Sequence, residues 1–235
     1  MISAFTISII IPVFNEASNL PDLLRFLLNP KRANVLEVIV VDGGSTDGSQ
    51  EIAEQFDVKL IRSLTRSRAV QLNLGAKEAR GDIFYFLHAD SRPLLSFDID
   101  ILQEASRGNQ AGCYRFEFDS TKKLLKVNSW FTRFNGVFSG GGDQSLFITK
   151  ILFEKLGGYD IRYSLMEDFD LVRRIRKETH FSIIPKAIKV SARKYDSNSW
   201  LKIQIINGLS MLAFYLKVNP EKIKTLYFSL LKNKI

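Results

Sequence analysis

Short apolar runs alternate with segments of helical periodicity along the first hundred residues of this chain. The run from Thr6 to Phe14 is rich in β-branched residues, which predicts a buried strand. Similar runs predict strands at 37–41, 58–61 and 83–87, and helical spacing predicts helices that begin near Ser18-Asn19, at about 47–55 and at 66–80. This alternation with short connections predicts right-handed crossovers and a parallel sheet.

The second half of the chain is less regular. We predict strands at 110–119 and 145–148, a short helix that ends at Gly157-Gly158, and a helix from about Glu167 to Lys177. Two short strands and two C-terminal helices, broken at Pro220, complete the prediction. Residues 121–134 are basic and aromatic-rich, and residues 136–144 contain four glycines. Such a window favours a mobile loop whose backbone can approach a ligand closely.

Composition is that of one ordinary globular domain spanning residues 1–235, with 46% hydrophobic and 25% charged residues. The net charge of +8 favours anionic partners. The basic residues are scattered and the sequence has no motif that recognises nucleic-acid bases, so we expect no nucleic-acid binding.

A single cysteine, Cys113, excludes an internal disulfide and suits a reducing compartment. The first residues lack the basic start of a signal peptide, so we expect a cytoplasmic protein.

Three acidic segments follow in fixed order: the Asp42 turn (VDGGSTD), His88-Ala89-Asp90, and Glu167-Asp168-Phe169-Asp170. The first two directly follow predicted strands. A carboxylate at the carboxyl end of a parallel strand is where an open α/β sheet places its ligand site.

Each segment also has a purely structural interpretation. Asp42 can open a turn whose next residues cap a helix, and acids in a first helical turn are favoured by the helix dipole. The loop after the first strand discriminates between classes of site. A dinucleotide-binding fold would carry G-x-G-x-x-G there, whereas this chain has Pro12-Val13-Phe14-Asn15-Glu16. We therefore reject a dinucleotide site; Phe14 can flank a base and Glu16 can accept a hydrogen bond.

The segment from Ile10 to Glu16, the Asp42 turn and the Glu167-Asp168 pair together resemble a family 2 glycosyltransferase of the GT-A fold, over roughly residues 5–178. Further residues resemble a bacterial subgroup of that family: Arg68-Ala69, Gln71, Asn73, Gly75-Ala76, His88-Ala89-Asp90 and Gly141-Gly142-Asp143-Gln144. The resemblance implies an α/β fold with a Rossmann-like, mostly parallel central sheet flanked by helices, followed by C-terminal helices. It divides the chain into a nucleotide-binding half (about 1–110), an acceptor and catalytic half (about 110–195) and those helices (about 197–235).

The resemblance also implies an activity: transfer of a sugar from a UDP- or GDP-linked donor to an acceptor hydroxyl, with inversion and with Mn²⁺ or Mg²⁺. We expect donor contacts from Pro12, Phe14, Glu16, Asp42, Arg68 and Asp90, and an acceptor lid that includes Gly141, Gly142, Asp143 and Gln144. Asp90 is the expected metal ligand, and His88 stands where the family's Asp-x-Asp pattern has its first acid. Asp168 is the expected base, with Asp143 in reserve. A catalytically silent nucleotide-sugar binding protein is the alternative.

The segment from Ser197 to Val218 bears on location. Its residues Leu201, Ile205, Leu209, Leu212 and Leu216 form the stripe that a core-packed helix needs, yet the opposite face is apolar too. Polar residues interrupt the segment and argue against a transmembrane span. Docking against the sheet or a second subunit, and contact with the inner face of a membrane through nearby lysines, both stay open.

Overall fold

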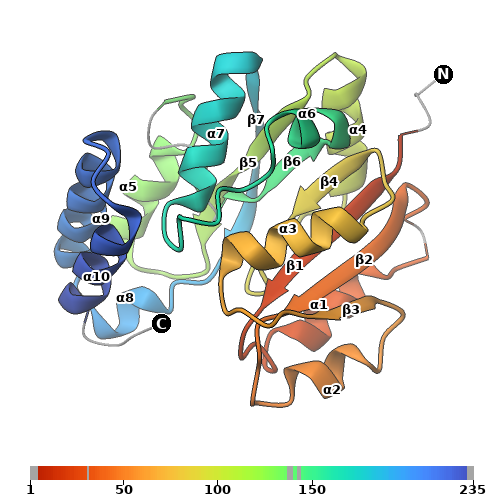
Figure 1. Ribbon diagram of the computed structural model, residues 1–235, viewed down its shortest axis with the longest axis horizontal. Helices are drawn as coiled ribbons and strands as arrows, with labels where there is room; N and C mark the ends of the chain where they lie inside the picture. The colour runs from red at the N-terminus through yellow and green to blue at the C-terminus, as the bar shows by residue number, and fades with distance from the viewer. Residues whose placement is uncertain (1–4, 31, 137–139, 142–143, 232–235) are drawn as a thin grey trace.

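A seven-stranded sheet organises the protein, in the order β3-β2-β1-β4-β6-β5-β7 (Figure 1). The computed structural model describes residues 5–30, 32–136, 140–141 and 144–231. Its strands are β1 (Ile7–Val13), β2 (Val35–Asp42), β3 (Lys59–Arg62), β4 (Ile83–Phe86), β5 (Ala111–Phe118), β6 (Leu146–Thr149) and β7 (Phe181–Val190). Strands β1 to β4 pair in parallel, as do β5 and β7, whereas β6 runs antiparallel to both of its neighbours. The sheet is therefore mostly parallel, as predicted.

Helices cover both faces of the sheet. One face carries α1 (Leu20–Leu27), α2 (Ser49–Ala53) and α4 (Phe97–Ser106), and the other carries α3 (Arg68–Glu78), α6 (Lys150–Lys155) and α7 (Glu167–Glu178). The remaining helices gather at the end of the molecule farthest from α2 and β3 (Figure 1): α5 (Lys123–Phe131), α8 (Lys194–Ser197), α9 (Trp200–Tyr215) and α10 (Pro220–Leu230).

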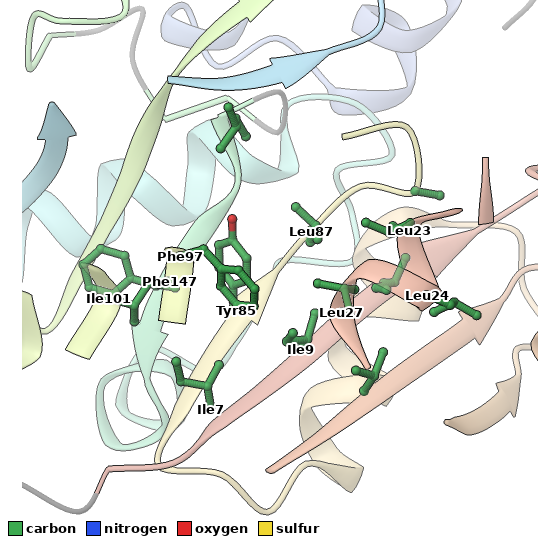
Figure 2. Close-up of a cluster of buried hydrophobic side chains, with 14 of the residues drawn as sticks. Ile7, Ile9, Leu23, Leu24, Leu27, Tyr85, Leu87, Phe97, Ile101 and Phe147 are labelled. Atoms are coloured by element: carbon green, nitrogen blue, oxygen red, sulfur yellow. The ribbon is translucent and has the colours of Figure 1, made fainter. Parts of the chain in front are cut away.

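Successive residues of the central strands feed two separate cores, because side chains alternate across a sheet. Ile9 and Ile11 of β1 join the cluster around α1 and α4, while Ile10 joins the cluster around α3 and α7. Figure 2 shows the first cluster, in which Leu23, Leu24 and Leu27 of α1 face β1, and Tyr85 of β4 lies beside Phe97 of α4. The Tyr85 and Phe97 rings are stacked with centroids 5.4 Å apart. Burial on both faces explains the continuous apolar runs of the sequence.

Two parts of the fold differ from the prediction. Helix α4 was not predicted, because its buried face includes Asp98 and Asp100 beside Phe97 and Ile101, which hides the apolar period. The prediction of two short strands after α7 was wrong, since β7 is one strand with an irregular register. Ile184 pairs with Tyr114 and Ala187 with the next residue of β5, so Pro185, which has no N–H to donate, falls in the interruption.

The leucine-rich stripe of α9, for which the sequence left docking and membrane contact open, faces solvent. All five of its members are exposed, and α9 buries Ile203, Ile206, Met211 and Phe214 against the rest of the protein. The sequence could not choose the face because both are apolar. None of the helices in the described part of the chain is long and apolar enough to cross a membrane.

Candidate active site

Five of the predicted donor-site residues lie at or just after the carboxyl ends of β1, β2 and β4: Pro12, Phe14, Glu16, Asp42 and Asp90. The chain runs outward from β1 through β2 to β3 and then returns to place β4 on the other side of β1. This reversal makes the β1–β4 boundary a topological switch point, where open α/β sheets bind ligands. Pro12 lies opposite Val41 near the end of β1, and Val13 lies opposite Asp42.

Asp42 is the last residue of β2 and is almost completely buried. Its Oδ2 accepts hydrogen bonds from the Gly44 and Ser45 amides, at 2.8 and 3.0 Å, and from the Gln50 side chain at 2.7 Å. Its Oδ1 is buried and has no hydrogen-bond partner among the described residues. The turn interpretation is thus correct for Oδ2, and among the described residues it leaves Oδ1 without a donor.

The loop after β1 is locked against the Asp42 turn. Asn15 has a positive φ of 54°, which asparagine tolerates better than most residues. Its amide donates to the Ser45 hydroxyl, and its side-chain oxygen accepts from the Thr46 amide, both at 2.9 Å. The preceding Phe14 carries the Arg66 guanidinium 3.6 Å from its ring centroid. Arg66 thus covers one face of the Phe14 ring, and the residue after Phe14 is bonded to the turn that follows Asp42.

Glu16 and Asp90 converge on one cation, the guanidinium of Arg193. The Nη2 atom of Arg193 lies 2.8 Å from Glu16 Oε1 and 3.0 Å from Asp90 Oδ2. The hydrogen bond to Glu16, with the negative charges of both carboxylates, raises the pKa of Arg193. Arg193 precedes α8 and was missed by sequence reasoning, because no local motif marks it.

The third acidic segment opens α7 and meets α3 across the site. Glu167 is buried and accepts a hydrogen bond from Arg68 Nη1 at 3.1 Å. Burial, followed by the charges of the neighbouring Asp168 and Glu167 carboxylates, raises the pKa of Tyr159 well above its usual value. Asp170 instead forms ion pairs within α7. Its Oδ1 lies 2.7 Å from Arg173 Nη2, and its Oδ2 lies 2.8 Å from Arg174 Nε.

Other motif residues have structural roles. The Gln71 amide donates to the carbonyls of Val13 and Val41, which ties the ends of β1 and β2 together. Asn73 exchanges two hydrogen bonds with the backbone of Tyr159. These contacts hold the site without facing it.

The described part of the glycine-rich segment lies against α7. Gln144 is buried, accepts from the Gly140 amide at 2.5 Å and donates to the Tyr114 carbonyl at 3.1 Å. A Cβ at Gly140 would lie 2.8 Å from the side chain of Val172. Gln144 thus ties Gly140 to β5, beside the helix that carries Asp168. Gly142 and Asp143 lie outside the described residues.

The point between Glu16 and Asp90, where the Arg193 guanidinium lies, offers two carboxylates to a divalent ion. The described residues contain no cluster of three or more His, Cys, Asp or Glu side chains suited to a metal. Two carboxylates do face one point, where Arg193 now lies. Mg²⁺ and similar ions bind through one or two carboxylates together with substrate phosphates. The residues present therefore fit such an ion once a diphosphate supplies further oxygens.

The sequence profile of Glycosyl transferase family 2 matches residues 8–156. The chain belongs to this family. The predicted resemblance is thereby confirmed, and so is the predicted α/β fold of the GT-A type.

Two relatives show how the likeness is distributed. Glycosyltransferase AglE of Haloferax volcanii is 38% identical over 96 residues, which cover 37% of this chain and 31% of AglE. The chain thus spans less than a third of that relative's length. A PGL/p-HBAD biosynthesis glycosyltransferase of Mycobacterium tuberculosis is 26% identical over 217 residues, covering 85% of this chain and 80% of that protein.

Solved structures share the fold at low sequence identity. The mannosyltransferase PcManGT from Pyrobaculum calidifontis, in complex with GDP-Man and Mn²⁺, superposes with a TM-score of 0.69 at 18% identity, over 95% of this chain and 68% of that one. TarS (residues 1–349) from S. aureus, in complex with UDP-GlcNAc, gives a TM-score of 0.68 at 15% identity, over 96% and 71%.

Proposed function

We propose that this glycosyltransferase takes a UDP- or GDP-linked sugar and transfers it to an acceptor hydroxyl with inversion at the anomeric carbon. The observation that carries the proposal is Asp42 Oδ1, which is buried with no hydrogen-bond partner in the described part of the chain, in the turn that the loop after Phe14 contacts. A buried carboxylate oxygen without a donor is costly, so a ligand N–H at this position stabilises the complex. The ring N–H of uracil or guanine can donate to this oxygen, so both proposed nucleotides suit the site.

The aromatic ring of Phe14 supplies the second element of base recognition. In the free protein the Arg66 guanidinium stacks on this ring. A nucleobase can stack on the same kind of surface, and an arginine beside it can contribute a cation–π interaction. Phe14 and Asp42 would then read the base face and the base edge respectively. Structural neighbours in complex with GDP-Man and with UDP-GlcNAc support a nucleotide-sugar donor.

The diphosphate would lie toward Asp90. Mn²⁺ or Mg²⁺, when bound, supplies positive charge that stabilises the leaving diphosphate. Asp90 and Glu16 would hold the ion, and Arg193 would give up its position between them. Once released from Glu16 and Asp90, the guanidinium of Arg193 would be free to pair with the diphosphate oxygens.

Asp168 is the proposed base. An inverting transfer is a single displacement, in which the acceptor hydroxyl loses a proton as its oxygen attacks the anomeric carbon and the diphosphate departs. Asp168 lies in the first turn of α7, where the helix dipole favours its ionised form. Asp170 is excluded because Arg173 and Arg174 occupy both of its oxygens.

A thermal-shift panel tests the donor, since a ligand that binds only the folded state raises its melting temperature. We expect UDP- or GDP-sugars with Mn²⁺ to raise it and ADP-sugars to leave it unchanged. Release of the nucleoside diphosphate is then followed for the donor that binds. No shift with any nucleotide sugar would contradict the proposal. Binding without any release, across a range of hydroxyl acceptors, would identify a silent binding protein instead.

A further inference from the structure

Helix α9 leaves a complete apolar stripe uncovered. Its side chains are 44 to 68% exposed: Leu201, Ile205, Leu209, Leu212 and Leu216. Their spacing of four, four, three and four residues places them on one side of the helix. The opposite side is buried and also apolar. A helix that is apolar all round normally has both sides covered, which indicates a partner for the free side.

Helix α5 and the residues just after it carry a second exposed apolar row, with a basic row beside it. The apolar row is Leu124, Val127, Phe131 and Phe134, and the basic row is Lys123, Lys126 and Arg133, with Trp130 between them. Each basic residue directly precedes an apolar residue in the sequence, as Lys123 precedes Leu124. Within α5 such neighbours point about 100° apart around the helix. An apolar face with flanking basic and aromatic side chains is the pattern of a helix that lies in a membrane interface.

Helices α5 and α9 are joined by hydrogen bonds, so their exposed rows lie on neighbouring helices. Asn128 of α5 donates to the Tyr195 hydroxyl at 3.1 Å and accepts from Trp200 Nε1 of α9 at 3.0 Å. Gln204, one turn further along α9, also donates to the Tyr195 hydroxyl, at 3.3 Å. In Figure 1 both helices lie at the end of the molecule away from α2.

Charge decides between the two possible kinds of occupant. Residues 120–142 and 197–220 contain no Asp or Glu, and both segments carry lysines. A second copy of the chain, docked through the same face, would bring like charges together across a two-fold interface. An anionic lipid surface complements the basic row and accepts the apolar side chains.

We propose that the exposed rows of α5 and α9 form a peripheral binding surface for anionic phospholipid membranes. We call it the α5–α9 surface: the five α9 stripe residues together with Lys123, Leu124, Lys126, Val127, Trp130, Phe131, Arg133 and Phe134. This inference does not depend on the identity of the sugar donor.

Vesicle co-sedimentation tests the proposal with the whole protein. We expect binding to phosphatidylglycerol-containing vesicles and much weaker binding to pure phosphatidylcholine vesicles. Lys123→Gln with Lys126→Gln should weaken binding to the anionic vesicles by about tenfold or more. Leu212→Ser with Leu216→Ser removes apolar area only, and should also weaken binding about tenfold or more.

Matched controls lie outside this surface. Leu64→Ser with Ile151→Ser removes two apolar side chains that are more exposed than Leu212 and Leu216, and Lys77→Gln removes an exposed lysine from α3. Both controls should bind vesicles like the unmodified protein, and circular dichroism should show all variants folded. Unchanged vesicle binding by the surface variants would overturn the proposal. So would a dimer in light scattering that Leu212→Ser with Leu216→Ser dissociates, with no vesicle binding by the unmodified protein.

Discussion

Arg193 donates a hydrogen bond to Asp90 across 103 residues of sequence, with 3.0 Å between Nη2 and Oδ2. The same nitrogen lies 2.8 Å from Glu16. A side chain of the protein thus holds the point at which the proposed cation would bind. Donor binding and the release of Arg193 from its carboxylates are therefore coupled in the proposed mechanism.

Replacing Arg193 by Ala should tighten binding of Mn²⁺ in the absence of nucleotide, because two carboxylates lose their competing cation. Two half-exposed ion pairs are worth about two- to thirtyfold in affinity. Calorimetry or electron paramagnetic resonance of Mn²⁺ measures the change, and Arg25→Ala, which removes an exposed arginine of α1, is the control. Full transfer activity of the unmodified enzyme in EDTA, lost in Arg193→Ala, would show instead that Arg193 itself neutralises the leaving group.

Asp42→Asn should weaken binding of the nucleoside diphosphate by about 1–3 kcal/mol. One side-chain oxygen can still accept from the Gly44 and Ser45 amides, while the other oxygen becomes an amino group that cannot accept. Asp42→Ala should lose at least as much, since the turn loses its acceptor as well. Calorimetry measures both, with Asp57→Asn as the control, because Asp57 precedes the amino end of β3 and Asp42 lies at the carboxyl end of the neighbouring β2. Equal affinities in all three variants would remove Asp42 from the donor site.

Asp168→Asn should leave donor binding intact and lower turnover by roughly 10²–10⁴, the usual contribution of a positioned base. Asp170→Asn should lower the melting temperature, because it weakens the ion pairs to Arg173 and Arg174. Steady-state kinetics and thermal denaturation separate the two effects. Near-normal turnover in Asp168→Asn together with an inactive Asp143→Asn would move the base to Asp143.

Gly75→Ala should destabilise the fold by about 1–3 kcal/mol through overpacking. A Cβ there would lie 2.4 Å from Ile10 Cγ2 and 3.1 Å from Val41 Cγ2, so α3 would have to move off the sheet. Gly208→Ala is the matched control, because its Cβ meets nothing within 4 Å on α9 and the change should be neutral or stabilise by up to about 1 kcal/mol. Urea denaturation of both variants checks the contrast; equal midpoints would contradict it.

Cys113 should resist alkylation in the folded protein. Burial raises the pKa of its thiol to about 12, so the reactive thiolate is scarce at about pH 8, where an exposed cysteine reacts readily. Iodoacetamide labelling followed by mass spectrometry should show modification only after the protein is unfolded. Rapid labelling of the native protein would mean that β5 opens locally.

Periodicity and local motifs determined much of this protein. The apolar runs fixed which strands are buried on both faces, and Asp42, Asp90 and Asp168 could be singled out because each follows a strand or opens a helix. Helix α4 was not predicted because the partners of its buried acids are distant in sequence. Lys186 Nζ, for example, lies 2.6 Å from Asp100 Oδ1. The exposed side of α9 could not be predicted, since two apolar faces give periodicity no preference.

Only the tertiary structure decided what surrounds the acids. Arg92 and Lys189 exchange backbone hydrogen bonds, at 2.8 and 3.2 Å, and so join the segment after Asp90 to the end of β7. That pairing carries Arg193 to Glu16 and Asp90. Likewise Arg68 meets Glu167 because α3 and α7 cover the same face of the sheet. Such contacts depend on strand order and on long-range pairing, which a local pattern of residues does not encode.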